Sequence, residues 1–277
     1  MKLLSLFSGI GAPEKALNNI GISYNLVGFS ELDKYAVKSY CAVHGVDESM
    51  NLGDITKIDE TLLPKDIDLI TYGFPCQDIS IAGKGKGLFN EDGSQTRSGL
   101  FFEALRIIEA TKPKVAIAEN VKNLTSKRFT DQFDIVLTSL ETAGYNNYWK
   151  ILNAKDFGIP QNRERVFIVS IRKDIDTGDF KFPTPFPLEL RAKDLLDDDV
   201  DEKYYLSEKV QNRFKITDET FTKNIVGTTK PEFRTIGQRD LVYQENSIIG
   251  SLVATDYKQP KQIVVSKPSL KQKESGV

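Results

Sequence analysis

A buried strand that ends abruptly constrains the fold most strongly. Ile67 to Tyr72 is an apolar run of strand length, and Gly73 and Pro75 stop it, so we expect Cys76 in a loop just past the strand's carboxyl end. Ligands bind at that place in open α/β sheets. A lone cysteine is more often a buried, inert thiol. The glycine, proline and polar residues around Cys76 argue against burial here.

Short apolar strands alternate with helical patterns as far as about Asp174. Strands are expected at 2–8, 25–30, 115–118, 147–153 and 166–171, and helices over 14–17, 35–44, 100–110 and 129–143. This alternation predicts an α/β fold with a parallel sheet. Beyond Asp174 the alternation decays, and Phe182 to Pro187 reads as a linker. A second, smaller domain of short strands and turns is expected to follow.

Composition excludes several classes of protein. A 277-residue chain with 40% hydrophobic and 27% charged residues is typical of a globular protein in solution. No apolar run approaches the roughly 18 residues of a membrane span, and Met1 leads directly into a strand rather than a signal peptide. Two cysteines form no disulfide framework, which favours a reducing, cytoplasmic location. The single histidine, His44, is interpreted as a helix-end residue, so protease triads and histidine–metal sites are poorly supplied and no metal is expected.

The charge is unevenly distributed along the chain. The formal net charge is −2, but Lys203 to Arg239 carries eight basic and four acidic residues. Neutralising phosphates supplies much of the affinity of proteins for nucleic acids. This window therefore predicts either a phosphate-binding surface or an ordinary solvated face, and its charge alone does not separate the two.

A glycine turn follows the first strand. Gly9 and Gly11 precede a helix, a layout in which backbone amides and a helix start face a nucleotide-type ligand. The turn lacks the third glycine of the dinucleotide fingerprint and the lysine of a phosphate-binding loop. Glu31 ends the second strand, where a carboxylate either accepts hydrogen bonds from ribose hydroxyls or is an ordinary surface group. Asp54 offers a further acceptor for an adenine amino group.

Two further segments supply polar side chains at the same edge. The glycine-rich stretch after Cys76 contains Lys84, Lys86 and Arg97, which favour a loop that closes over a phosphate backbone. Glu119 ends the strand that follows the one before Cys76, so thiol and carboxylate share one edge if the two strands are neighbours. Strand alternation would direct Arg163 and Arg165 to one face.

The chemistry of a thiol beside a carboxylic acid narrows the reaction. A free cysteine has a pKa of about 8.5, so the site must activate it. A carboxylic acid can assist addition of a thiol to an electron-poor ring by protonating a ring nitrogen. We expect Glu119 to be buried, so that the protonated acid is available near neutral pH.

Four segments in order resemble the DNA cytosine-5 methyltransferases of bacteria and their phages. They are LFSGIG at 6–11, GFPCQDIS at 73–80, ENV at 119–121 and QNRER at 161–165, with weaker similarity at 191–196 and 249–255. The resemblance implies an S-adenosylmethionine-dependent methyltransferase fold. Such a fold is Rossmann-like, a mostly parallel sheet with helices on both faces, and carries a smaller, mainly β or irregular target-recognition domain.

The resemblance also implies a mechanism. Cys76 would attack C6 of a cytosine, Glu119 would hold and protonate N3, Arg165 would bind the O2 side and Arg163 would support the site. C5 would take the methyl group of S-adenosylmethionine, and loss of the C5 proton with release of Cys76 would leave 5-methylcytosine. C6 is shielded in a stacked duplex, so the base must flip out of the helix.

The resemblance assigns the binding residues as well. The cofactor site would be lined by Phe7, Gly9, Ile10, Gly11, Glu31, Asp54, Ile55 and Pro75. Double-stranded DNA would be contacted by Gln77, Ser80, Lys84, Lys86, Arg97 and Gln161. We expect a monomer on DNA, in a restriction-modification system with a cognate restriction endonuclease or in a phage's protection against one.

Three regions follow from the resemblance. Residues 1–174 would be the catalytic and cofactor-binding domain, 175–248 a small target-recognition region, and 249–277 a return segment with a polar tail. The family's usual last segment, with a Gly-Asn-Ser turn and a helix that completes the cofactor pocket, is not found in this sequence. A truncated enzyme, weakened cofactor binding, or a split enzyme whose second chain supplies that helix are therefore open.

Two alternatives to an active DNA methyltransferase remain. A relative of this fold methylates cytosine in transfer RNA, but its Cys-Phe-Thr signature is absent here. A catalytically inactive module that binds DNA or cofactor is favoured by the missing last segment. Retention of Cys76, Glu119, Gln161 and Arg165 together argues against it.

Overall fold

The computed structural model describes residues 1–75, 88, 90, 96–212, 225–228, 240–253, 256, 258 and 260–265. It divides the chain into two compact units. The first comprises Met1–Leu152 and Glu164–Pro183, and the second comprises Asn153–Arg163 and Thr184–Val277. Residues 153–163 thus belong to the second unit, although they lie within the sequence of the first. The assignment of 175–248 to target recognition stays a prediction.

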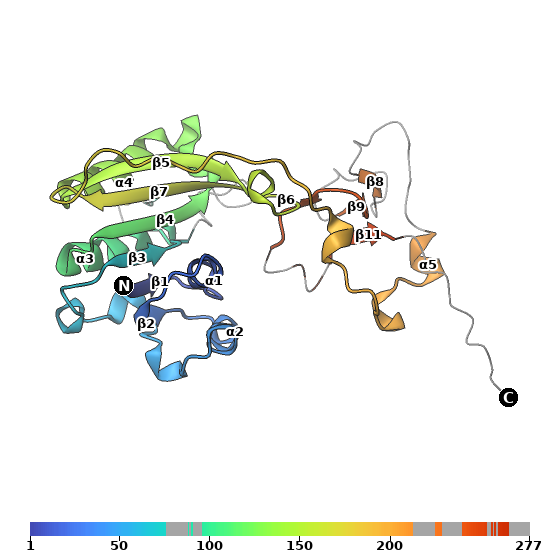
Figure 1. The fold of residues 1–277 in the computed structure, drawn as a ribbon, viewed down its shortest axis with the longest axis horizontal. Helices are drawn as coiled ribbons and strands as arrows, with labels where there is room; N and C mark the ends of the chain where they lie inside the picture. Colours follow the sequence, from blue (N-terminus) through green and yellow to red (C-terminus); the bar gives the residue numbers. More distant parts are fainter. Residues whose placement is uncertain are drawn as a thin grey trace. The chain divides into compact units, whose positions relative to one another are not determined.

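A six-stranded sheet forms the centre of the first unit (Figure 1). Its order is β2-β1-β3-β4-β7-β5, with β1 parallel to β2 and β3, β3 parallel to β4, and β7 antiparallel to β4. The strands are β1 (Lys2–Leu6), β2 (Asn25–Ser30), β3 (Leu69–Tyr72), β4 (Val115–Val121), β5 (Tyr145–Asn153) and β7 (Glu164–Arg172). The mostly parallel sheet expected from the sequence is confirmed, and so is the adjacency of the strands before Cys76 and at Glu119.

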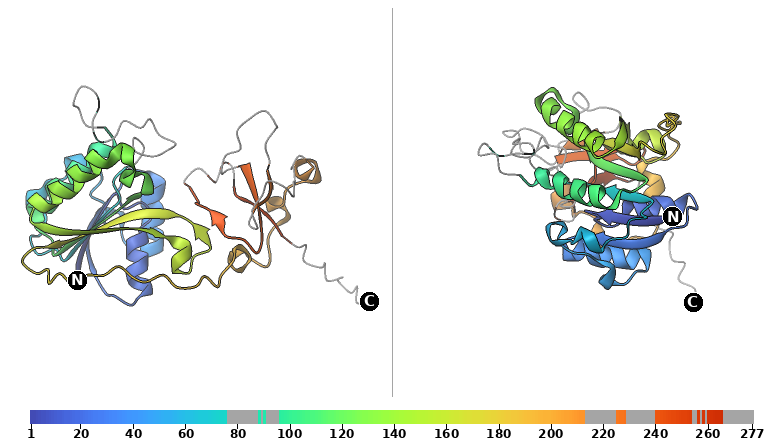
Figure 2. Two further views of the ribbon diagram at one scale, coloured as in Figure 1. Left: turned by 90° about the horizontal axis from the view of Figure 1, so that it is seen from above. Right: turned by 90° about the vertical axis from the view of Figure 1, so that its left-hand side faces the viewer.

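Helices cover both faces of this sheet. They are α1 (Ala12–Asn19), α2 (Lys34–His44), α3 (Phe101–Thr111) and α4 (Thr130–Thr142). The chain moves one way along the sheet from β1 to β2, through α1. It moves the other way from β3 onward, through α3 and α4. Right-handed crossovers therefore place α1 on one face and α3 and α4 on the opposite face. Figure 2 shows this arrangement. The reversal lies between β1 and β3, where ligands bind in open α/β sheets.

Local sequence explains where the helices begin and end. The carboxylate of Asp33 accepts hydrogen bonds from the amides of Tyr35 and Ala36 at 2.8 and 3.0 Å, which caps the start of α2. Gly45 ends that helix with a φ of 64°, a conformation that glycine adopts without steric penalty. His44 is therefore the last residue of α2, as the sequence predicted.

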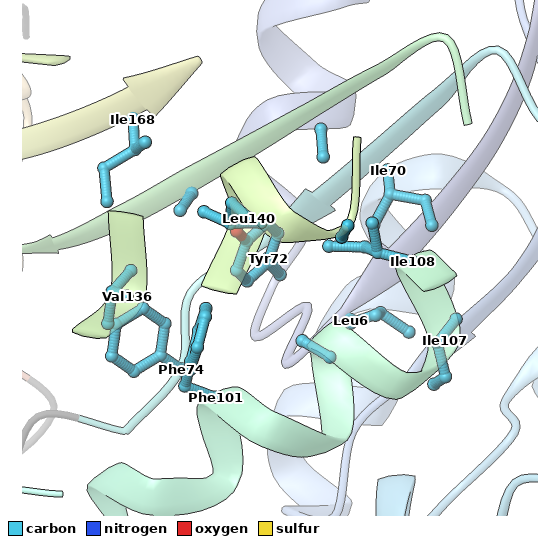
Figure 3. Packing of buried hydrophobic residues seen from close by; sticks show 14 of the residues in the cluster. Leu6, Ile70, Tyr72, Phe74, Phe101, Ile107, Ile108, Val136, Leu140 and Ile168 are labelled. Atoms are coloured by element: carbon cyan, nitrogen blue, oxygen red, sulfur yellow. The ribbon is translucent and has the colours of Figure 1, made fainter. Parts of the chain in front are cut away.

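The main core lies between the sheet and the α3–α4 face. Its buried side chains come from β1, β3, β4 and β7 on one side and from the two helices on the other (Figure 3). Those labelled in the figure are Leu6, Ile70, Tyr72, Phe74, Phe101, Ile107, Ile108, Val136, Leu140 and Ile168. Burial of such side chains stabilises a fold by about 1.5–3 kcal/mol each. A smaller cluster of Phe29, Val37 and Tyr40 joins α2 to β2.

The second unit is built from short elements. β6 (Gln161–Asn162) pairs in parallel with β10 (Ile249–Gly250), and β9 (Leu241–Gln244) lies between β8 (Ile225–Thr228) and β11 (Gln262–Val264). A four-residue helix, α5, spans Glu208–Gln211. Within the residues described here, no helix has the length and apolar character needed to cross a membrane.

Candidate functional site

The glycine turn between β1 and α1 has an unusual backbone. Phe7, Gly9 and Gly11 have φ values of 52°, 55° and 78°. A left-handed conformation is free for glycine but costs a phenylalanine about 1 kcal/mol or more, so surrounding contacts must maintain it. The amide of Ser8 donates to Ser30 O at 3.0 Å. Ile10 lies on the outside of the turn and is 58% exposed.

Glu31 stabilises this turn with its carboxylate. Its Oε2 accepts a hydrogen bond from the amide of Gly9 at 2.9 Å, and its Oε1 accepts from Leu32 and Asp33 at 2.8 Å each. A carboxylate has about four acceptor positions. Three are occupied by backbone amides, so Glu31 retains capacity for one ligand hydroxyl while it fixes the turn.

Asn51 is a functional candidate that sequence reasoning missed. Its Oδ1 accepts from the amides of Glu31 and Gly53 at 3.1 and 3.0 Å, and its Nδ2 donates to Glu31 O at 3.1 Å. One side chain therefore links Glu31 with the segment before Asp54. No motif marks Asn51, and only its position two residues before a glycine could have drawn attention to it.

Asp54 and Ile55 follow Gly53 in the chain but differ from each other in environment. The Asp54 carboxylate caps a short 3₁₀ helix, η2 (Ile55–Lys57), by accepting from the Thr56 hydroxyl at 2.8 Å and the Thr56 amide at 3.0 Å. These two hydrogen bonds, the hydroxyl's first, lower the pKa of Asp54. The Ile55 side chain is buried in the main core. Their contacts with a cofactor stay predictions.

An ion pair joins β4 and β7 at the same edge of the sheet. Glu119 lies opposite Phe167 in the antiparallel register, so Arg165 is its diagonal neighbour on the same face. Arg165 Nε lies 2.8 Å from Glu119 Oε1, and the Arg165 side chain is only 19% exposed. A second bond, from Arg165 Nη1 to Glu164 O at 2.8 Å, fixes the guanidinium further.

The same carboxylate reaches the strand that leads to Cys76. A Cβ atom on Gly73 would lie 3.6 Å from Glu119 Oε2, so the acid lies beside this glycine, three residues before the cysteine. The burial expected for Glu119 was wrong, because its side chain is 39% exposed and paired with a guanidinium. The acid is thus held by its charge partner rather than isolated in apolar surroundings.

Asn120 is a second residue that sequence reasoning left without a role. It is buried, and its Nδ2 donates to Phe74 O at 3.1 Å, while its Oδ1 accepts from the Val121 amide at 2.8 Å. The buried amide therefore ties β4 to the chain immediately before Pro75. Its place between Glu119 and Val121 in the ENV segment was the available signal.

The two arginines of the QNRER segment do not share one strand. Arg163 falls between β6 and β7, belongs to the second unit, and donates from Nη1 to Leu252 O at 3.1 Å. The prediction that strand alternation would direct both guanidinium groups to one face was therefore wrong, because the strand is interrupted at Arg163. Gln161, a predicted DNA contact, pairs with Ile249 through β6 and β10.

Several predicted site residues lie outside the described part of the chain: Cys76, Gln77, Ser80, Lys84 and Lys86. Arg97 is described and exposed at the start of a 3₁₀ helix, η4 (Ser98–Leu100). The first unit therefore brings together the glycine turn, Glu31 and Asn51 after β1 and β2. Glu119, Arg165, Asn120 and Gly73 meet at the ends of β3, β4 and β7.

Comparison with known proteins agrees with this geometry. The model of the C-5 cytosine-specific DNA methylase family matches residues 1–276. An orphan methyltransferase of Bacillus phage SPR is 41% identical over 240 residues, 76% of this chain and 53% of the phage protein. That of Bacillus phage rho11s is 37% identical over 295 residues, 92% of this chain and 58% of the relative. The chain thus spans somewhat more than half the length of these relatives.

A third relative and the solved structures extend the comparison. A type II methyltransferase of Neisseria lactamica is 35% identical over 271 residues, 96% of this chain and 79% of the relative. A mutant DNMT2 of Spodoptera frugiperda has the same fold, with a TM-score of 0.66 at 17% identity over 97% of this chain and 75% of that structure. S. pombe Dnmt2 gives a TM-score of 0.61 at 18% identity over 97% and 77%. The chain belongs to the C-5 cytosine-specific DNA methylase family.

Proposed function

We propose that this chain carries the catalytic machinery of a DNA (cytosine-5-)-methyltransferase. The enzyme would methylate C5 of a flipped cytosine within a specific double-stranded DNA sequence. The observation that carries the proposal is the Glu119–Arg165 ion pair, with Glu119 Oε2 against Gly73 three residues before Cys76. An acid and a guanidinium at the edge where the chain leads to Cys76 are, together with the thiol, the groups that addition to a cytosine ring requires.

Each side chain has a distinct task in this proposal. The Cys76 thiolate would add to C6, and C5 would then take the methyl group. Loss of the C5 proton to water would re-form the C5–C6 double bond and release the thiolate, so the enzyme would be restored after each turnover. In its protonated form Glu119 would donate a hydrogen bond to N3, which makes the ring more electron-poor, and it would accept a hydrogen bond from the exocyclic amine. Arg165 orients Glu119 and binds the O2 side. Arg163 would support the site.

The residues around the glycine turn suit S-adenosylmethionine. Glu31 keeps an acceptor position for a ribose hydroxyl, and Gly9 and Gly11 present backbone without side chains. When bound, the cofactor supplies the methyl group. Phe7, Ile10, Asp54, Ile55 and Pro75 would complete the site around it.

DNA would be held by the remaining predicted contact residues. Lys84, Lys86 and Arg97 would contact phosphates near the flipped base, and Gln77, Ser80 and Gln161 are the other proposed DNA contacts. The basic window from Lys203 to Arg239 lies in the proposed target-recognition region. Two relatives are named orphan methyltransferases. By analogy, this protein too would act without a cognate restriction endonuclease. Double-stranded DNA is then the essential macromolecular partner.

Covalent trapping tests the proposal. DNA containing 5-fluorocytosine cannot lose a proton from C5, so with cofactor present the purified chain should form an adduct that survives denaturing electrophoresis. Cys76→Ser should abolish it. An adduct that persists in Cys76→Ser, or none with the unchanged chain, would contradict the proposed catalysis.

The same experiment separates the alternative of an incomplete, inactive methylase. Such a module would bind duplex DNA or cofactor in equilibrium measurements yet form no adduct. Addition of a separately expressed carboxyl-terminal segment from one of the longer relatives would restore the adduct if the enzyme is split. An RNA substrate would instead produce trapping on 5-fluorocytosine RNA in preference to DNA.

A further inference from the structure

The peptide between Ile10 and Gly11 is fixed at both of its polar ends. Ile10 O lies 3.1 Å from His44 Nε2, and the amide of Gly11 donates to Ser8 O at 2.9 Å. Because a peptide group is planar, these two bonds together determine its orientation. The glycine turn thus depends on a side chain 34 positions later, at the end of α2.

The histidine ring is packed directly against the turn. A Cβ atom at Gly11 would lie 2.2 Å from His44 Nε2 and 2.8 Å from Tyr40 Cε2, distances that no real side chain tolerates. Gly11 also has a φ of 78°. Glycine is required at this position both for the backbone conformation and for the approach of the imidazole.

A chain of contacts fixes the imidazole and leads back to α1. The centroids of the His44 and Tyr40 rings lie 4.7 Å apart. The Tyr40 ring stacks on the Phe29 ring, with 4.0 Å between their centroids. The Tyr40 hydroxyl donates to Oε1 of Glu14 at 2.9 Å, and Glu14 is fully buried in the first turn of α1. Burial, followed by the charge of Glu14, raises the pKa of Tyr40, so this hydroxyl remains a donor.

The contact defines the tautomer of His44. A carbonyl oxygen only accepts hydrogen bonds, so Nε2 must carry the proton that it donates to Ile10 O. In the neutral ring Nδ1 then holds a lone pair, and this buried atom has no hydrogen-bond partner among the described residues. His44 therefore contributes to the site through Nε2–H.

We propose that His44 is a positioning residue for the cofactor site: its Nε2–H holds the Ile10 carbonyl and keeps the glycine turn in the shape that binds S-adenosylmethionine. This inference rests on the proposed function. His44 touches neither reacting atom, so its loss should weaken cofactor binding without slowing methyl transfer at saturation. No sequence motif marks this histidine.

A pair of substitutions isolates the hydrogen bond. His44→Leu removes the donor, whereas His44→Gln keeps a side-chain N–H of comparable reach, and both lose the imidazole equally. One neutral hydrogen bond contributes about 0.5–1.5 kcal/mol, or roughly a 2- to 13-fold change in affinity. We expect His44→Leu to raise the Kd for S-adenosylhomocysteine, measured by titration calorimetry, and the KM for cofactor by that factor, with kcat unchanged. His44→Gln should recover most of the loss.

Controls separate this inference from the function on which it rests. Val43→Ala, at an exposed neighbour on the same helix, should leave the Kd unchanged. If His44→Leu binds as tightly as the unchanged chain, or if both His44 variants lose affinity and thermal stability equally, the positioning role is wrong. If the unchanged chain binds no S-adenosylhomocysteine, the proposed function fails first, and the inference fails with it.

Discussion

At the scale of single residues, the site depends on one acid whose position is set by its neighbours. Arg165 pairs with Oε1 of the Glu119 carboxylate, and Oε2 lies on the side of Gly73. Glu119→Gln keeps the shape and accepts the same hydrogen bond from Arg165, but it cannot transfer a proton. General acid catalysis contributes about 10²- to 10⁴-fold. We expect the rate of covalent trapping to fall by that amount while cofactor affinity is unchanged.

A neighbouring acid provides the matched control. Glu164 pairs with Lys122 at 2.9 Å, is 42% exposed and lies one residue from Arg165. Glu164→Gln should trap 5-fluorocytosine DNA at nearly the unchanged rate. Equal losses in the two variants would show that general electrostatics, rather than an acid at position 119, controls the reaction.

The buried amide of Asn120 gives a second prediction at this scale. Asn120→Ala leaves Phe74 O without its donor, and an unsatisfied buried group costs about 1–3 kcal/mol. Because this bond lies next to Pro75 and Cys76, trapping should slow more than tenfold, while the Kd for cofactor stays within twofold of normal. Trapping kinetics and calorimetry on one preparation measure both. A parallel loss of both would indicate general misfolding instead.

At the scale of elements, Arg106 on α3 binds the segment that contains two short 3₁₀ helices, Ile55–Lys57 and Glu60–Leu62. Its guanidinium donates to Ile55 O at 2.9 Å and Ile58 O at 3.0 Å, and it pairs with Glu60 and Glu103. Arg106→Met should lower the free energy of unfolding by roughly 2–3 kcal/mol, because two carbonyls lose a charged donor. Urea titration followed by the fluorescence of the single Trp149 measures the change in the first unit.

Trp149 is a suitable reporter because its ring packs edge-on against Phe133 at 5.0 Å between β5 and α4. Lys114→Met is the comparison, since its ion pair with Asp68 is exposed and such pairs contribute at most about 1 kcal/mol. If the two variants destabilise equally, the Arg106 network has no special role.

Aspartate caps make the first unit sensitive to acid. Asp54 and Asp59 each accept from a threonine hydroxyl and amide at the start of a 3₁₀ helix, and the hydroxyl's bond is the larger cause of their lowered pKa. A carboxylate whose pKa is lower in the folded than in the unfolded protein stabilises the fold at pH values above the unfolded pKa, which is about 3.9 for aspartate. This stabilisation is lost as the pH falls through the folded-state pKa. Urea midpoints should therefore be constant from pH 7 to about 5 and fall below about 4. Asp54→Asn with Asp59→Asn should flatten that fall.

At the scale of the whole molecule, one basic window of the sequence belongs to a different unit from the cofactor chemistry. The basic window at 203–239 lies outside the first unit, which carries Glu119 and the glycine turn. Each phosphate neutralised contributes about −0.9 to the slope of log affinity against log salt. Replacing two lysines of the window, Lys223 and Lys230, by glutamine should make that negative slope shallower by up to about 2. The Kd for cofactor should not change. An unchanged slope would mean that the window does not meet the phosphates.

The sequence by itself determined the local parts of this protein. Apolar periodicity, with glycine and proline at the ends of runs, placed β2 at 25–30 and ended α2 at His44, and the ordered motifs named the acid and the thiol. These features depend on residues close together in the chain, so a linear pattern records them.

Only the tertiary structure decided which distant groups meet. It made β7 antiparallel to β4, which brings Arg165 to Glu119, and it left Glu119 partly exposed. It also placed Arg163 in the other unit and His44 against the glycine turn. Pairings across tens of residues are selected by the packing of whole elements against one another, and no local pattern records that choice.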